Sequence, residues 1–308
     1  GLYQVHVHTD TPRAALPRAG RARQVCVHHL HPTALAVAAG WEADEPPLPG
    51  AGRIEDSRVV SFERLAARRA RNRAARRDRS MRQHPSHLGS STPAGERTGV
   101  IACTRAPGLI EQLARTGAVV VLDPERDGIV RAAVDLGLER VIVLPCDVDC
   151  VAHAHEAARF LAARSAASHV RGAADGAPAP GDGVHLLVCD SDDEARVLAA
   201  AVAVAGRDED LTALARRAGR AAVELRALAL SGPDAEADAV AAALSSALRP
   251  EDELVTVILG RDAMPDVGAL AAEAVTRYGE RALGDPDAIE VVIHAGGQAR
   301  PDVLLALE

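Results

Sequence analysis

The sequence predicts an α/β fold with parallel or mixed sheets, helices on both faces and two α/β lobes. From residue 99 onward, short continuous apolar strands alternate with helices of about ten residues, which is typical of βαβ units around a parallel sheet. Apolar residues make up 48% of the 308 residues and aromatic residues only 2%. Ala, Val and Leu therefore fill the core, as they do in helices and buried strands.

Each expected element follows from its local pattern. Runs of Val, Ile and Leu predict strands, and amphipathic stretches between them predict helices. Strands are expected at 100–103, 118–122, 140–144, 184–189, 253–260, 289–294 and 303–307, with an ambiguous strand at 222–230. Helices are expected at 107–116, 126–136, 151–164, 194–204, 208–220, 234–248 and 265–278. Asp192 or Asp193 is expected to cap the helix that begins at Glu194.

The first 41 residues predict a fragment of a small α+β domain. Residues 2–8 alternate as a strand does, with Val5 and Val7 on one face and two histidines on the other. A short helix at 13–16 and a strand at 23–28 follow. Two strands and one helix make only part of a domain, so further residues are expected before Gly1. Residues 42–97 are rich in Pro and Arg and predict a disordered linker, and residues 98–308 form the C-terminal α/β domain.

Charge divides the chain into a basic and an acidic part. Residues 1–97 hold 16 Arg against 9 acidic residues, whereas residues 98–308 hold 19 Arg against 34 acidic residues. An acidic main body argues against a nucleic acid partner, because phosphate contacts need a positive binding face. The five cysteines show no regular spacing, no apolar run is long enough to cross a membrane, and the start does not resemble a signal peptide. We expect a protein of the reducing cytoplasm.

Two stretches carry a resemblance to a known family. The opening GLYQVHVHTD, with Pro12, resembles the HxHT segment that closes the middle domain of the kinase component of bacterial fatty acid kinases, a family related to dihydroxyacetone kinases. The ending is the stronger match: DELVTVILGRD at 252–262, then a helix, HAGGQ at 294–298 and a last strand are similar to the C-terminal domain of that family. Residues 100–145 resemble the same domain in the order and spacing of their elements.

The resemblance implies a role without an ATP site in this chain. In such kinases an N-terminal domain carries ATP and magnesium, and the phosphorylated fatty acid is held by a separate, DegV-like binding protein in a pathway of phospholipid synthesis. The C-terminal region is similar in fold to that acyl-binding partner and takes part in assembly with it. Neither of the glycine-rich phosphate-binding motifs, GxxxxGK[ST] and GxGxxG, occurs in the sequence. ATP and magnesium are therefore expected only through a domain outside this chain, which alone is expected to be inactive.

The resemblance also implies a zinc ion at His6 and His8, with a cysteine from upstream. Two histidines two apart on a strand project to one face, but a structural zinc needs four ligands. The site is thus incomplete here, and the alternative is a pair of solvent-facing histidines. The neighbouring strand offers further candidate ligands, which are Cys26, His28, His29 and His31.

A second group of candidate ligands follows the expected strand at 140–144. Cys146 and Cys150 lie four apart at a turn where α/β sheets bind ligands. Asp147, Asp149, His153 and His155 are close in the sequence. These spacings converge poorly on one metal ion, so we interpret the aspartates as helix caps and the cysteines as half-buried thiols.

Partner contacts are predicted at two further segments. The turn of Gly296, Gly297 and Gln298 follows a strand directly, and its glycines permit a close backbone approach to a partner or ligand. An arginine run could instead meet an anionic membrane surface, although a solvated linker is the simpler interpretation. Its members are Arg64, Arg68, Arg69, Arg71, Arg73, Arg76, Arg77, Arg79 and Arg82.

Two functions remain open from the sequence. The first is an accessory region of a fatty acid kinase that docks the acyl-binding subunit for a separate ATP-binding domain. The second is an independent small-ligand or lipid-binding module, with a cleft near Cys146 and Gly296 and no kinase activity. A homodimer is compatible with either function.

Overall fold

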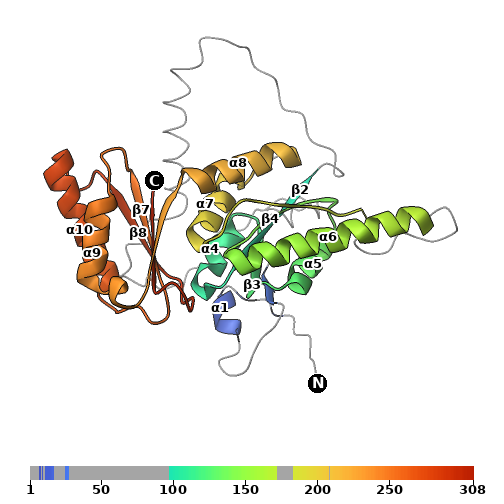
Figure 1. The fold of residues 1–308 in the computed structure, drawn as a ribbon, viewed down its shortest axis with the longest axis horizontal. Coiled ribbons are helices and arrows are strands. Elements are labelled where there is room, and N and C mark those ends of the chain that lie inside the picture. The colour runs from blue at the N-terminus through green and yellow to red at the C-terminus, as the bar shows by residue number, and fades with distance from the viewer. Residues whose placement is uncertain are drawn as a thin grey trace, which may run out of the picture.

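The structure is a computed structural model that describes residues 7, 9, 11–16, 25–27, 97–171, 183–207 and 209–308. It has an α/β fold with two sheets and with helices on both faces, as the sequence predicts (Figure 1). The strand predicted at 2–8, the linker predicted at 42–97, and the histidines and arginines within them lie outside the described residues, except Val7 and Arg97. The short helix predicted near residue 13 is present as α1 (Pro12–Ala15).

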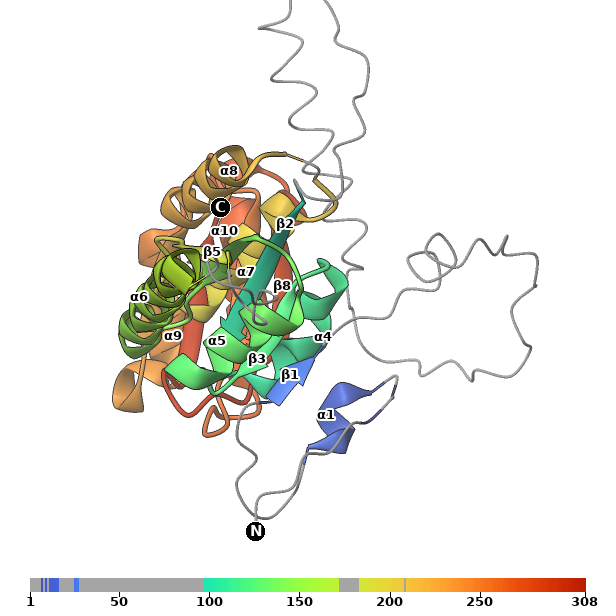
Figure 2. The same cartoon turned by 90° about the vertical axis from the view of Figure 1, so that its right-hand side faces the viewer.

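Five strands form the first sheet, in the order β1-β3-β2-β4-β5. Their bounds are Val25–Val27 (β1), Thr98–Thr104 (β2), Val119–Leu122 (β3), Arg140–Leu144 (β4) and His185–Val188 (β5). Strands β2 to β5 pair in parallel, whereas β1 pairs antiparallel with β3 at one edge (Figure 2). The strand predicted in the N-terminal fragment therefore belongs to the same sheet as the strands that follow residue 98.

Helices cover the two faces of the first sheet. Helices α5 and α6 pack side by side on one face, and α4, α7 and α8 lie on the other (Figure 1). Their bounds are Ile110–Arg115 (α4, preceded by a 3-10 turn at Pro107–Leu109), Arg126–Asp135 (α5), Val148–Arg171 (α6), Glu194–Val204 (α7) and Leu211–Glu224 (α8). This sheet and these helices are the first lobe.

Four strands form the second sheet, in the order β6-β9-β7-β8. Their bounds are Arg226–Leu230 (β6), Leu254–Leu259 (β7), Glu290–Ala295 (β8) and Val303–Leu307 (β9). Strands β7 and β8 are parallel, and β9 is antiparallel to both β6 and β7. Helices α9 (Ala237–Ala247) and α10 (Val267–Tyr278) cover its outer face. This sheet and these two helices are the second lobe.

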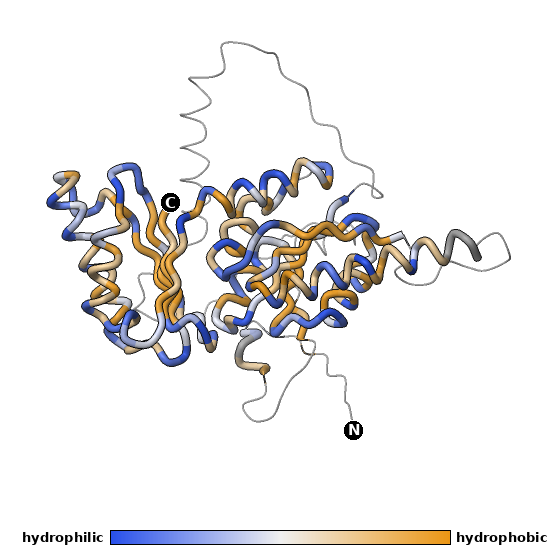
Figure 3. Tube along the Cα trace, in the orientation of Figure 1, coloured by the Kyte–Doolittle hydropathy of each residue, from blue (hydrophilic) through white to orange (hydrophobic). Residues whose placement is uncertain are grey.

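Helix α7 lies between the two sheets. Eight of its eleven residues are Ala or Val, and most of its residues are buried, including the acidic Glu194. On the second sheet, Leu304 and Ala306 of β9 pack in the same core as α7, whereas Val303, Leu305 and Leu307 face α9 and α10. The alternation buries both faces of β9 (Figure 3). Small side chains on α7 allow the two sheets to approach one helix closely.

The main differences from the sequence prediction lie at helix ends. Helix α6 runs to Arg171, whereas the sequence predicted an end at Arg164. Helix α8 continues to Glu224, so the ambiguous strand predicted from residue 222 begins only at Arg226. Ala-rich stretches favour helix whenever packing allows it, and apolar content alone cannot mark the boundary. Among the described residues, no helix is long and apolar enough to cross a membrane.

Of the two aspartates that the sequence offers as the cap of α7, the structure selects Asp193. Its side chain accepts a hydrogen bond of 2.8 Å from the backbone N–H of Arg196. Asp193→Ala is expected to lower the free energy of unfolding by about 1 kcal/mol in urea denaturation, because it removes this cap. The neighbouring Asp192→Ala serves as the control and should change stability by less than about 0.5 kcal/mol, since its ion pair with Arg196 is exposed. Equal effects of the two substitutions would contradict the assignment of the cap.

Candidate functional site

Polar side chains gather at the carboxyl ends of β2 and β4. Thr104 ends β2 and Arg105 follows it, Cys146 and Asp147 follow β4, and Glu194 begins α7. The carboxyl edge of a parallel sheet is where α/β proteins usually bind ligands. Chain segments far apart in the sequence thus form one candidate site at this edge.

Glu194 is the most buried acidic group of the site, with 4% of its surface exposed. Its carboxylate accepts hydrogen bonds from the Thr104 hydroxyl at 2.7 Å and from the Arg105 backbone N–H at 2.6 Å. Burial raises the pKa of Glu194 to about 7, because the desolvation of the charge outweighs these hydrogen bonds. Glu194 can therefore hold or release a proton near neutral pH.

Arg105 and Asp147 form an ion pair across the mouth of the site. The Nε of Arg105 donates to Oδ2 of Asp147, and about one third of each side chain is exposed. Burial raises the pKa of Asp147, but the hydrogen bonds from Arg105 and from the Cys150 backbone N–H outweigh it, and the net pKa is lowered. Asp147 therefore stays ionised and holds the guanidinium at the sheet edge.

Asp147 also caps the first turn of α6, as the sequence predicts for the aspartates of this segment. Its Oδ1 accepts a hydrogen bond of 2.6 Å from the backbone N–H of Cys150. Cys146 and Cys150 are buried, not half-buried as predicted, because the cap holds this turn down against the sheet. His153 points elsewhere, and its Nδ1 lies 3.2 Å from the carbonyl oxygen of Pro124.

A third thiol joins this pair. Cys103, from β2, and Cys146 are the two groups that most affect the pKa of Cys150. Hydrogen bonds donated by the two neighbouring thiols lower the pKa of Cys150. The pKa values of Cys103 and Cys146 are raised, first by the hydrogen bond to Cys150 and then by burial. Three buried cysteines at this edge of the sheet thus influence one another's pKa values.

The predicted contact turn lies where the two lobes meet. Gly296 directly follows β8, and its carbonyl oxygen accepts a hydrogen bond of 2.8 Å from the N–H of Gly108. Gly108 lies two residues beyond Ala106 in the loop that follows β2. The carboxyl edge of the first sheet and the turn after β8 are therefore in direct contact.

Gln298 is buried behind this turn, with 1% of its surface exposed. Its Nε2 donates to the Pro301 carbonyl oxygen at 3.2 Å, and its backbone carbonyl accepts from Arg261 N–H at 2.9 Å. Gly297 has a positive φ of 74° and donates to the Leu259 carbonyl. The turn is therefore tied to the loop that follows β7, and the side chain of Gln298 is buried behind it.

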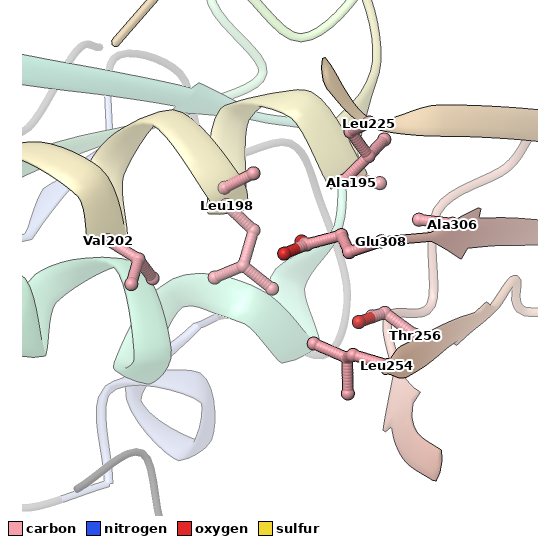
Figure 4. Close-up of a pocket in the computed structure, with 9 residues that line it drawn as sticks. Ala195, Leu198, Val202, Leu225, Leu254, Thr256, Ala306 and Glu308 are labelled. Atoms are coloured by element: carbon pink, nitrogen blue, oxygen red, sulfur yellow. The ribbon is translucent and has the colours of Figure 1, made fainter. Parts of the chain in front are cut away.

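A small hollow with a cavity volume of about 20 Å³, room for about one water molecule, lies between α7 and the second sheet (Figure 4). Apolar side chains of α7, including Leu198 and Val202, form one wall. The other wall carries Leu254, Thr256 and Glu308, and the carboxylate of Glu308 points toward α7. The sequence prediction placed a cleft near Cys146 and Gly296, whereas this hollow lies deeper along α7.

The predicted zinc ligands His6 and His8 lie outside the described residues, as do His28, His29 and His31. Cys26 is described on β1, where it pairs with Val121 of the first sheet. In the part of the chain that the structure describes, no group of three or more His, Cys, Asp or Glu side chains could hold a metal ion. The zinc prediction is therefore not tested by these residues.

Comparisons with known proteins give no family for this chain. No protein-family model matches the sequence, and no curated protein matches it. The function is therefore inferred from the residues and their arrangement.

Sequence reasoning missed three residues of the site. Cys103 lies inside an apolar strand, Gly108 looks like an ordinary helix start, and Glu194 follows two candidate caps as one more acidic residue. Their partners are remote: Glu194 binds a residue 90 positions away. The one available signal was an acidic residue at the start of an otherwise apolar Ala/Val helix.

Proposed function

We propose that this chain is the accessory region of a fatty acid kinase, and that it docks the acyl-binding subunit for phosphorylation by a separate ATP-binding domain. The observation that carries the proposal is the pairing of the two family-like segments near the C-terminus. Strand β7 comes from the DELVTVILG segment, the HAGGQ segment begins in the last two residues of β8, and the two strands are adjacent and parallel. Residues that carry the resemblance are thus adjacent in the second sheet.

The docking surface consists of the loop that follows β7, residues 260–266, which is backed by the turn at residues 296–297. The two loops are joined by hydrogen bonds, and Met264 is 57% exposed within the first of them. An exposed Met on a loop held by backbone hydrogen bonds suits protein recognition, because its flexible side chain adapts to a partner. The nucleotide chemistry is assigned to another domain, since neither phosphate-binding glycine motif occurs in the 308 residues.

The chain is expected to bind an acid-loaded acyl-binding subunit in isothermal titration calorimetry. Met264→Asp should weaken this binding at least about tenfold, because a carboxylate would be desolvated at the interface. Val223→Asp is the matched control, since Val223 is an equally apolar, 71% exposed residue on α8 of the other lobe. It should leave the affinity within about twofold.

Activity provides the second arm of this test. With ATP and magnesium, acyl phosphate should form only when an ATP-binding domain is added. Acyl phosphate formed from the loaded acyl-binding protein and this chain, without any other protein, would refute the proposal, as would equal weakening by Met264→Asp and Val223→Asp.

A second candidate function is a small-ligand or lipid-binding module, which the hollow beside α7 favours. Its walls are apolar apart from Thr256 and Glu308, but its volume of about 20 Å³ admits only about one water molecule, so an alkyl chain would have to widen it. Native mass spectrometry of the purified chain separates the two functions. A co-purified small molecule that is lost in Leu198→Trp would favour the module, whereas a complex with the acyl-binding subunit favours docking.

A further inference from the structure

Strand β8 is one edge of the second sheet. It pairs with β7 along its whole length and with no other described strand. It has six residues and is the longest edge strand in the described part of the chain, since β1 has three, β5 four and β6 five. Proteins usually protect such an edge with a short strand, a charge, a proline or a bulge. The centre of β8 is Val291, Val292 and Ile293, so it carries none of these protections.

The hydrogen bonds of β8 show which of its backbone groups face away from β7. The N–H of Glu290 donates to the carbonyl oxygen of Glu253, so Glu290 faces β7. Backbone groups of successive residues point to opposite sides of a strand, and Val291, Ile293 and Ala295 therefore point outward. The outward groups of Val291 and Ile293 make no hydrogen bond to any described residue. They are free to pair with a further strand.

The first lobe closes one end of this edge. A Cβ on Gly108 would lie 1.8 Å from the carbonyl oxygen of Ala295, so the loop after β2 lies directly against that oxygen. A further strand therefore has access to Val291 and Ile293 but not to Ala295.

The side chains of β8 divide between its two faces. Ile293 is 42% exposed and lies on the side of α10, where a Cβ on Gly268 would be 3.2 Å from its Cγ2 atom. Val291 packs against the core on the same side. The opposite face carries Glu290, Val292 and His294.

We infer that β8 is an interface for a second copy of this chain, in which the two β8 strands pair antiparallel about a two-fold axis at Val292. In this register Val291 of each copy lies opposite Ile293 of the other. These are the two residues with free outward groups, and each such pair exchanges two backbone hydrogen bonds. The two four-stranded sheets join into one continuous sheet.

This register is complementary on both faces. On the side of α10 the pairs of Val291 with Ile293 are apolar, and on the other face Val292 meets its own copy. Glu290 lies opposite His294, so an imidazole N–H can donate to the carboxylate. A two-fold interface needs such self-complementarity, and opposed pairs of these kinds stabilise a sheet.

Neighbouring registers with a two-fold axis fit less well. An axis at Ile293 would pair Val291 with Ala295, whose carbonyl oxygen is covered by Gly108. An axis at Val291 would place the carboxylate of Glu290 opposite the apolar Val292. Pairing limited to residues 290–294 makes a small interface, so the dimer is expected to be weak and to depend on concentration.

Sedimentation equilibrium of the whole chain tests this inference. The mass should rise from 32.0 kDa toward twice this value as the concentration increases. Ile293→Lys should weaken dimerisation at least about tenfold, because a lysine on an edge strand opposes pairing. Val223→Lys on α8 is the control, since Val223 is 71% exposed and lies away from this edge, and it should leave the dimerisation constant within about twofold. Circular dichroism checks that both variants are folded.

Cysteine substitutions test the register and do not depend on the folding of Ile293→Lys. Residues opposite each other on antiparallel strands have Cβ atoms about 4.5–5.5 Å apart, which is close to the range of a disulfide. Val292→Cys should therefore give a disulfide-linked dimer on mild oxidation, seen in non-reducing electrophoresis. Val291→Cys is the control and should link at least about tenfold more slowly, because its own copy is not opposite it. The wild type measures the background from the five native cysteines.

Three results would overturn the inference. They are a mass of 32.0 kDa at every concentration up to about 0.5 mM, a dimer that Ile293→Lys weakens no more than Val223→Lys, and equal rates of linking in Val292→Cys and Val291→Cys. Weaker binding of the acyl-binding subunit to Ile293→Lys, with an unchanged homodimer, would also overturn it, because the edge would then belong to that subunit. The mass and linking measurements contain only this chain, so their outcome is independent of the docking proposal.

Discussion

Gly108→Ala is expected to lower the free energy of unfolding by about 3 kcal/mol, measured by urea denaturation. A Cβ at this position would lie 1.8 Å from the Ala295 carbonyl oxygen and 2.8 Å from its carbonyl carbon. Both are backbone atoms, so no side chain can move aside. The substitution must therefore push the turn after β8 away from the loop after β2 and break the hydrogen bond between Gly108 and Gly296.

The matched control is Gly219→Ala in the middle of α8. A Cβ there meets nothing within 4 Å, so the substitution should stabilise the protein by about 0.5–1 kcal/mol through the better helix propensity of Ala. The two substitutions make the same chemical change with opposite expected signs. If Gly108→Ala leaves the free energy of unfolding unchanged, Gly108 does not make this close contact with the turn after β8.

Glu194→Gln is expected to stabilise the protein by about 3 kcal/mol at pH 8 and to have little effect near pH 5. The folded state binds the Glu194 proton more tightly than the unfolded state, because burial raises the pKa from 4.5 to about 7. The contribution of this proton to the free energy of unfolding is therefore complete below about pH 4.5 and is lost as the pH rises through 7. Gln can imitate the protonated acid, accepting from the Arg105 N–H and donating to the Thr104 hydroxyl.

Urea denaturation at several pH values between 5 and 8 measures this difference. Asp147 has a lowered pKa and stays ionised throughout this range, so it does not mask the effect. Glu156→Gln, on the exposed face of α6, makes the same charge change and should shift stability by less than about 0.5 kcal/mol at every pH. The difference in the free energy of unfolding between the wild type and Glu194→Gln should change with pH. If it stays constant, Glu194 is ionised in the folded protein at pH 5.

The strands of the first sheet could be predicted well because their signal is local. The runs at 119–122 and 141–144 are apolar throughout and buried throughout, and parallel strands buried on both faces need that composition. The antiparallel pairings of β9 in the second sheet could not be predicted. Register and direction depend on neighbours that are remote in the sequence, and short apolar runs do not specify them.

The candidate site could be predicted only in part. The turn at Cys146 and Asp147 was located because a polar pair directly follows an apolar strand. The carboxylate that completes the site was not, since Glu194 acquires its raised pKa only when α7 is buried between two sheets. Sequence spacing argued against convergent metal ligands at Cys146 and Cys150, but it could not show that Cys103 of β2 lies at the same edge of the sheet.

The position of α7 has a consequence for how the molecule denatures. Its Ala and Val side chains fill the space between both sheets, so removal of either sheet would expose the helix and leave the other sheet without a cover. Neither half can retain its structure once its counterpart melts. A calorimetric scan should therefore show a single endotherm for residues 98–308, and limited proteolysis should not release a durable half-molecule.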